Sequence, residues 1–171
     1  MALILAPAYL ANGLSSVFGG GKPLDNGRFF VDGKRILGDG KTTRGTTAGF
    51  LAGVFGSLAV IVLGNLSDTG IFYTVEHFLL GSIVALGAIL GDLFGAFLKR
   101  RIGLQRGAAA PGLDQLGFIL FALLFAYAYT IMQSIIPITS VMVLFAVTVT
   151  PFIHLLGNIV GFRIGKKQVP W

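Results

Sequence analysis

The chain alternates between long apolar runs and short polar segments rich in glycine. A helix needs about 20 apolar residues to cross roughly 30 Å of hydrocarbon, at 1.5 Å per residue. Cutting the sequence on that rule predicts five membrane-spanning helices, at about 1–18, 45–64, 77–98, 115–132 and 138–162. The last two divide one run without Asp, Glu, Lys or Arg, at the polar turn QSIIP. The pattern predicts an all-α integral membrane protein with one transmembrane domain, 1–171, and polar loops at 19–44 and 99–114.

The composition supports a membrane protein, and the positions of the basic residues predict its orientation in the membrane. Of the 171 residues, 54% are hydrophobic and 12% are charged, which is unlike a soluble domain. The basic residues fall within 22–44, 99–106 and 163–167, and none lies in the second loop or in the QSIIP turn. The positive-inside rule therefore predicts an outer N-terminus, a cytoplasmic C-terminus and a large cytoplasmic first loop.

Several classes are excluded or disfavoured at this stage. The net charge of +6 is explained largely by topology, so no nucleic-acid partner is expected. A cleaved signal peptide is not expected either, because nothing basic precedes the first apolar run. The absence of cysteine excludes disulfides, thiolate metal sites and thiol nucleophiles.

The first loop contains more than topology requires, in the stretch DNGRFFVDGKRILGDGKTTRG. Its aspartates stand seven residues apart and are followed by glycine or glycine-containing turns: Asp25, Asp32 and Asp39. Such turns expose backbone N–H groups and gather basic side chains, which suits an anionic ligand. The basic side chains are those of Lys34, Arg35, Lys41 and Arg44. The alternative is a solvated loop with internal ion pairs. A Walker site is excluded, because that motif needs glycine where Arg35 stands and a preceding strand.

A second constellation lies in GDLFGAFLKRRIGLQRGAAAPGLDQLGF, residues 91–118. Asp92 is the one carboxylate within a predicted span, and such a charge is costly unless it faces a cavity and finds a partner. Gly95 and Lys99 follow at i+3 and i+7, on the same helix face. Asp114 opens the fourth span, where a helix N-cap is the alternative explanation. Two carboxylates at adjacent helix ends, beside Lys99, Arg100 and Arg101, are suited to Mg²⁺ with a polyphosphate.

The two histidines are poorly placed for acid–base work at that end. His77 belongs to the outer end of the third span. His154 shares a stripe with Thr150 and Asn158 and is interpreted as a helix–helix hydrogen-bonding group. A lipid phosphate is already ionised, so as a nucleophile it removes the need for a protein base.

The order of these motifs resembles a known family. PLDNG, DGKRILGDGKTTRGT, GDLFGAFLKRRIG and PGLDQLGF are similar, over nearly the whole chain, to the archaeal CDP-archaeol synthases. The second constellation is distantly similar to CDP-diacylglycerol synthases, although Gln115 stands where that family has arginine. The resemblance implies a CTP-dependent cytidylyltransferase, in which the phosphate of 2,3-di-O-geranylgeranylglycerol 1-phosphate attacks the α-phosphorus of CTP and releases pyrophosphate.

The resemblance also implies roles for these residues. Asp92 and Asp114 are expected to hold Mg²⁺, with one or two cations left open. Cations expected to neutralise the triphosphate are Lys41, Lys99 and Arg100, extended by Thr42, Thr43 and Arg44. The segment from Asp25 to Asp39 is expected to fold over the nucleotide, with Asp25, Asp32 and Arg35 contributing to its binding. Asn12 and Ser15 are expected to line the same cleft as Gly95, although helix packing explains them nearly as well.

Three other functions are less consistent with these residues. A small membrane cation transporter would also place one aspartate in a span, but its polar residues ought to continue to the outer face. A CDP-alcohol phosphotransferase would need D-G-x-x-A-R followed by G-x-x-x-D-x-x-x-D, which is missing. A non-enzymatic membrane scaffold leaves the combination of Asp92, Lys99 and Asp114 unexplained. The sequence does not predict the oligomeric state.

Overall fold

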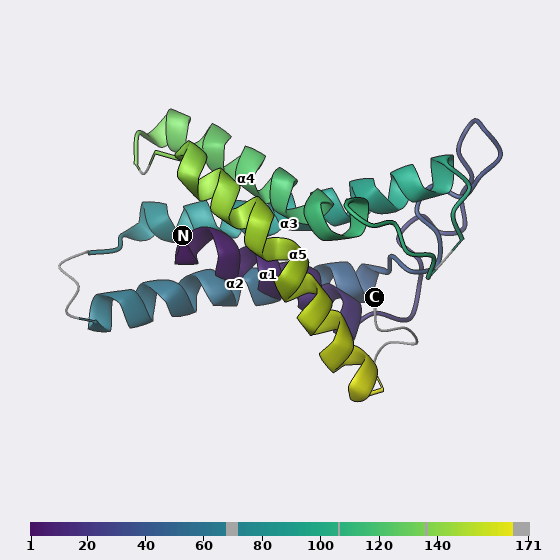
Figure 1. Ribbon diagram of the computed structural model, residues 1–171, viewed down its shortest axis with the longest axis horizontal. Helices are drawn as coiled ribbons and strands as arrows, with labels where there is room; N and C mark the ends of the chain where they lie inside the picture. The colour runs from purple at the N-terminus through teal and green to yellow at the C-terminus, as the bar shows by residue number, and fades with distance from the viewer. Residues whose placement is uncertain (68–71, 106, 136, 166–171) are drawn as a thin grey trace.

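The protein is a bundle of helices whose last helix crosses the others obliquely, with its longest loop at one end (Figure 1). The computed structural model describes residues 1–67, 72–105, 107–135 and 137–165. Over these residues the helices are α1 (Ala2–Val17), α2 (Thr43–Leu66), α3 (Val75–Arg101), α4 (Leu113–Gln133) and α5 (Ser140–Arg163). The expected all-α class is confirmed. Arg106, Lys166 and Lys167, used above for orientation, lie outside the described residues.

Within the part of the chain that the structure describes, four helices, α2 to α5, are long and apolar enough to cross a membrane. The first helix differs, because α1 has 16 residues and covers only about 24 Å at 1.5 Å per residue. The ends also differ from expectation by a few residues, most at α3, which continues through the basic residues to Arg101. The architecture is that of an integral membrane protein with four candidate spans and a short apolar N-terminal helix.

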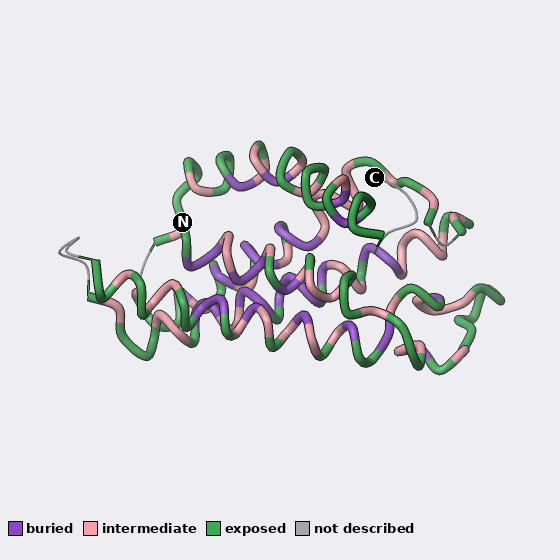
Figure 2. The backbone as a smooth tube through the Cα atoms, turned by 90° about the horizontal axis from the view of Figure 1, so that it is seen from below, coloured by how far each residue is buried: buried purple, intermediate pink, exposed green. Residues whose placement is uncertain are grey.

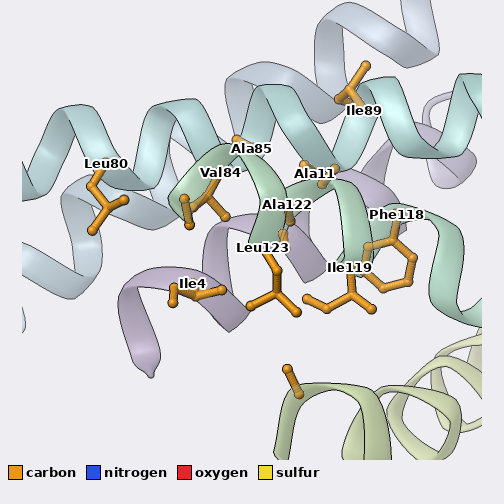
Figure 3. Packing of buried hydrophobic residues seen from close by; sticks show 14 residues of the cluster. Ile4, Ala11, Leu80, Val84, Ala85, Ile89, Phe118, Ile119, Ala122 and Leu123 are labelled. Carbon is orange, nitrogen blue, oxygen red and sulfur yellow. The ribbon is translucent and has the colours of Figure 1, made fainter. Parts of the chain in front are cut away.

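Helix α3 forms the centre of the bundle and packs against α1, α2 and α4. Its buried face carries Leu80 and Val84, which lie beside Ile4 of α1 and Leu123 of α4 (Figure 3). Many of the other core residues are alanines, which let the helix backbones approach closely. This packing holds α3 in place, and with it the C-terminal end of the helix, where its polar residues lie.

Glycines on one face of α2 bring it close to α1. Gly45, Gly49 and Gly53 are buried in this contact. A Cβ atom at Gly45 would lie 2.6 Å from the carbonyl oxygen of Ser15, so a side chain there would force the helices apart. Ser15 therefore lies at the α1–α2 contact, in agreement with the helix-packing explanation of this residue.

Helix α5 lies along one side of the bundle and is largely exposed (Figure 2). It packs against α4 and, less extensively, against α1. One polar contact joins it to α1, where Tyr9 Oη and Thr150 Oγ1 are 2.9 Å apart. Loose packing on this side leaves room for an apolar cavity between α1, α4 and α5.

Candidate active site

A polar cleft of about 170 Å³ opens at the end of α3 where the basic residues gather. Its α3 wall includes Asp92, Gly95 and Lys99, the three residues that helical spacing places on one face. Gly95 leaves space there, since a Cβ atom would meet nothing closer than Leu113 at 3.8 Å. Asp114 at the start of α4 lies on the same cleft. The helix ends therefore bring together the residues of the second constellation.

The first loop forms another side of the cleft. We call residues 18–42 the lid loop; its Leu37, Gly40 and Lys41 line the cleft. Lys41 Nζ lies 2.6 Å from Asp92 Oδ2, although the two residues are 51 positions apart. The loop returns to α2 at a bridge between Pro23 and Thr42. The structure therefore joins the two sequence constellations in one place.

Each cleft carboxylate is paired with a lysine. Lys41 is the one side-chain partner of Asp92 among the described residues. Lys99 Nζ donates to both oxygens of Asp114, at 2.8 and 3.0 Å, and the N–H of Ala110 donates to Asp114 Oδ2 at 3.0 Å. The N-cap of α4 is Gly112, so Asp114 is not the cap but a first-turn residue. A negative side chain is favoured there by the helix dipole.

Arg100 adds a cation to the cleft wall. Its Nε atom is buried and, within the described part of the chain, has no hydrogen-bond partner. The Nε atom of Arg101, which does not line the cleft, shares this feature, so an unpaired Nε does not by itself indicate a ligand. Arg100 thus lies on the cleft wall, and its role toward a triphosphate stays a prediction.

Asp25 occupies a different position from the one expected of a nucleotide ligand. It is buried in the lid loop, and its carboxylate accepts five hydrogen bonds. The donors are Gly27 N at 3.1 Å, Leu37 N at 3.0 Å, Gly38 N at 2.9 Å, and Arg35 Nε and Nη2 at 3.2 and 2.7 Å. A carboxylate offers about four lone-pair sites, so Asp25 is fully engaged by the protein. It is not among the residues that line the cleft, and its surroundings make it the organiser of the loop.

The hydrogen bonds determine the charge state of Asp25. Burial alone would raise the pKa of its carboxyl, but the Arg35 guanidinium and the three backbone N–H groups outweigh burial. The net result holds the pKa of Asp25 well below its usual range. Asp25 is therefore a permanent anion at neutral pH that holds residues 35–38 in place.

Asp32 and Arg35 also contact protein groups instead of lining the cleft. Asp32 Oδ1 accepts from Arg101 Nη1 at 2.7 Å. Arg35 Nη2 lies 2.9 Å from Asp39 Oδ1 in addition to its pair with Asp25. The two ion pairs of Arg35 are internal to the loop, as the alternative explanation of this loop expects, whereas that of Asp32 joins the loop to α3.

The threonines after Lys41 begin helix α2. Thr42 is its N-cap, and the Thr42 Oγ1 atom accepts from Gly45 N at 3.1 Å. Thr43 and Arg44 are exposed in the first turn of α2. None of the three lines the cleft as described, so a contact with the triphosphate remains a prediction.

An apolar cavity of about 250 Å³ adjoins the polar cleft, and Phe118 of α4 lines both. Asn12 lines this cavity, so it lies on a different hollow from the one expected. His154 and Asn158 of α5 line the cavity too, and His154 Nδ1 lies 3.2 Å from Asn158 Nδ2 within the same helix. In the polar stripe on α5, Thr150 forms a hydrogen bond with Tyr9 of another helix, α1.

The cleft matches the requirements of Mg²⁺ only together with a substrate. Among the described residues no three His, Cys, Asp or Glu side chains gather into a metal cluster. Mg²⁺ is usually bound through one or two carboxylates, water and substrate phosphates, and not by a cage of protein ligands. Asp92 and Asp114, hard oxygen donors on one cleft, fit that mode of binding.

Comparisons with known proteins agree with the motif order. The family model described as "CarS-like: CDP-archaeol synthase" matches residues 1–171. The CDP-archaeol synthase of Methanococcus aeolicus is 40% identical, with 99% of this chain and 94% of the relative covered. That of Thermococcus kodakarensis is 42% identical, with 98% and 92% covered.

A solved structure is also similar to this fold. It is described as "Structural insight into an intramembrane enzyme for archaeal membrane lipids biosynthesis". The TM-score is 0.75 at 37% identity, with 92% of this chain and 91% of the other covered. From the full-length match and the shared fold, this chain belongs to the CarS-like family of CDP-archaeol synthases.

Proposed function

We infer that the protein is a membrane cytidylyltransferase that makes unsaturated CDP-archaeol and pyrophosphate from CTP and 2,3-di-O-geranylgeranylglycerol 1-phosphate. The observation that carries this inference is the full-length match to CDP-archaeol synthases. The cleft supports it independently, because it combines two carboxylates with Lys41, Lys99 and Arg100. The cation-transporter alternative has no support, since Asp92 pairs with Lys41 in that cleft.

The chemistry follows from the charges that line the cleft. An oxygen of the lipid phosphate forms a bond to the α-phosphorus of CTP, and the bond from that phosphorus to the oxygen bridging to the β-phosphate breaks. Pyrophosphate leaves with that electron pair, and no protein base is needed because the nucleophile is already ionised. Lys41, Lys99 and Arg100 neutralise the triphosphate and the charge that develops on the leaving group. Thr43 and Arg44, exposed beside Lys41, extend this contact.

Asp92 and Asp114 would hold Mg²⁺ at the phosphates. A bound Mg²⁺ supplies charge neutralisation and orientation at the reacting phosphate oxygens. The same carboxylates now hold Lys41 and Lys99, so both lysines lie within reach of a phosphate bound beside them. The protein therefore contributes mainly by positioning the cations and the substrates, and forms no covalent bond with them.

The apolar cavity beside Phe118 is suited to the isoprenoid chains of the lipid. Its lining is mostly apolar, and it adjoins the polar cleft, so a phosphate in the cleft and a chain in the cavity can belong to one molecule. Loose packing of α5 offers access from the surrounding hydrocarbon.

We place the cleft on the cytoplasmic side, with α1 as a fifth span that ends near the lid loop. The support is the concentration of basic residues at that end. Because the chain has no cysteine, Val31→Cys gives one reactive thiol, at a side chain 94% exposed. A membrane-impermeant maleimide should label it in broken cells and not in intact ones. Labelling in intact cells would reverse the orientation.

The decisive assay for this function is pyrophosphate release by the purified protein in detergent with CTP, Mg²⁺ and the ether lipid phosphate. Release should need all three components and should fall when ATP replaces CTP or lipid is left out. Release without lipid would indicate a nucleotide hydrolase instead. No release with accessible lipid would contradict the proposed function.

A further inference from the structure

Three successive cations at the end of α3 have three different partners. Lys99 binds Asp114 of α4. Arg100 lines the cleft and lies against the lid loop, since a Cβ atom at Gly38 would be 3.5 Å from Arg100 Nε. Arg101 leaves the cleft and contacts the tip of the lid loop. Successive residues of a helix point about 100° apart, so the side chains of Lys99, Arg100 and Arg101 can contact three different parts of the protein. Topology needs only their charge, so these separate contacts require another explanation.

Arg101 is surrounded by one structural unit of the lid loop. Residues 28–36 form a hairpin, here called the lid hairpin, closed by the hydrogen bonds of Phe30 N to Lys34 O and of Ile36 N to Arg28 O at 2.8 and 3.1 Å. The Arg101 guanidinium donates to Asp32 Oδ1 at 2.7 Å and to the carbonyl oxygens of Lys34 and Arg35. In return, Lys34 Nζ donates to the Arg101 carbonyl oxygen at 2.7 Å, which satisfies one of the free carbonyls at the end of α3.

Aromatic rings complete this contact. The Arg101 guanidinium carbon lies 4.8 Å from the centre of the Phe30 ring and 4.7 Å from that of Phe97. Phe30 belongs to the lid hairpin and Phe97 to α3, and the two rings meet edge to face at 5.3 Å. The cation therefore joins a ring from each side, a geometry that a planar guanidinium satisfies and an ammonium does not reproduce.

A chain of contacts leads from this hairpin to the cleft. Arg35, whose carbonyl receives Arg101, also binds Asp25. Asp25 in turn accepts from the N–H groups of Leu37 and Gly38. Leu37 lines the cleft, and the Gly38 carbonyl accepts from Lys41 N at 3.3 Å. A continuous series of hydrogen bonds thus connects the lid hairpin to Lys41.

We propose that Arg101 is the latch that holds the lid loop closed over the cleft, and that it sets the affinity for CTP as a positioning residue without touching the substrate. The proposal rests on the proposed function. If only the closed loop binds CTP, apparent affinity falls in proportion to the closed fraction. Arg101→Met should therefore raise KM for CTP about tenfold, equivalent to ~1.4 kcal/mol, while kcat and KM for the lipid change less than about threefold.

Matched variants separate the latch from loss of charge. Arg28→Met removes the same charge from an exposed side chain of the same hairpin and should leave KM for CTP within about twofold. Arg101→Lys keeps the charge but not the fork, so its effect should lie between parent and Arg101→Met. Asp32→Asn should raise KM in the parent and add little in Arg101→Met, because one contact is broken in both. Additive effects would assign Asp32 to the substrate and overturn the latch.

Spin-label distances test loop closure independently of turnover. The chain has no cysteine, so Val31→Cys and Leu66→Cys, at side chains 94% and 79% exposed, can be labelled alone. The parent and Arg28→Met should show one narrow distance distribution; Arg101→Met should show a broad or shifted one. If Arg101→Met does not fold, Arg101→Lys and Asp32→Asn carry the same test.

The outcomes distinguish the latch from the proposed function. Unchanged distances in Arg101→Met would overturn the latch, as would a collapse of kcat with KM unchanged, which would make Arg101 a substrate contact. A parent protein that releases no pyrophosphate would refute the proposed function, while the distances would still decide whether Arg101 holds the loop.

Discussion

The carboxylate of the lid loop and those of the cleft have opposite surroundings. Asp25 accepts hydrogen bonds from three backbone N–H groups and both ends of the Arg35 fork. Asp92, in contrast, has a single lysine partner among the described residues, and Asp114 has Lys99 and one backbone N–H. Asp25 is buried, whereas the cleft carboxylates keep 20% and 34% of their side-chain surface exposed.

The difference separates a structural anion from ones that can bind a ligand. The oxygens of Asp25 have no free lone pair for a metal or a ribose hydroxyl. Asp92 and Asp114 keep acceptor capacity, and their lysine partners are flexible cations that can turn to a phosphate. The contrast predicts two different effects of substitution. Changes at Asp92 or Asp114 should lower the rate of the reaction, whereas a change at Asp25 should disorder the lid loop.

The largest effect is expected for Asp92→Asn. Loss of the charged ligand should lower the rate of pyrophosphate release by more than about 100-fold, beyond the 10–100-fold typical of an outer partner of a metal ligand. Loss of the Asp92–Lys41 pair, whose side chains are 20% and 23% exposed, should also lower the thermal unfolding midpoint, so turnover is compared at a temperature at which both proteins stay folded. Normal turnover in Asp92→Asn would show that Asp92 is not a metal ligand, and the contrast with Asp25 would then rest on Asp114 alone.

Asp25→Asn should act on the loop first. It leaves Arg35 without its main partner and should destabilise the closed loop by about 2–3 kcal/mol, at or below the low end for a broken buried pair because Arg35 is 24% exposed. Trypsin should then cut at Arg28, Lys34 and Arg35 at least about tenfold faster, with Asp92→Asn as the resistant control. A loop equally resistant in both variants would remove the structural role of Asp25.

The pH dependence of the loop follows from the lowered pKa of Asp25. A carboxyl whose pKa is lower in the folded protein contributes stability that is present above its unfolded value, about 3.9, and is lost as the pH falls toward the folded value. The loop should thus stay closed from pH 7 to about 4 and open only in stronger acid. Spin-label distances across that range should show this change in the parent, and it should be absent in Asp25→Asn.

The smallest effect is expected for Asp39→Asn. Asp39 shares Arg35 with Asp25, but its side chain is 59% exposed, and exposed ion pairs contribute about 0–1 kcal/mol. Proteolysis of the loop and turnover should both stay within about threefold of the parent. A loss comparable to that of Asp25→Asn would show that charge near Arg35, and not the buried hydrogen-bond network, organises the loop.

The cleft was more predictable from sequence than the lid loop because its residues follow local rules. Helical spacing alone places Asp92, Gly95 and Lys99 on one face. Asp114 begins the next antiparallel helix, so its position near Lys99 follows from a short connection. Thr42, in contrast, was expected at the triphosphate and is instead the N-cap of α2, because its hydroxyl accepts from Gly45 N.

The partners within the lid loop could not be predicted in the same way. Asp25, Asp32 and Asp39 have similar neighbours in sequence, yet only Asp25 is buried. The pairing of Asp25 with Arg35 depends on how the loop folds back over 10 positions, and the pairing of Asp32 with Arg101 depends on how the loop docks on α3, 69 positions away. No periodicity records such contacts, so the sequence left internal ion pairs in this loop as an alternative and did not assign their partners.

Binding of Mn²⁺ as a paramagnetic substitute for Mg²⁺ tests the central contrast most directly. Electron paramagnetic resonance should show Mn²⁺ bound to the parent protein in the presence of CTP. The apparent affinity should fall at least about tenfold in Asp92→Asn and in Asp114→Asn, because each removes a charged oxygen ligand, and should be kept in Asp39→Asn. Equal Mn²⁺ binding in all four proteins would contradict the assignment of the metal to the two cleft carboxylates.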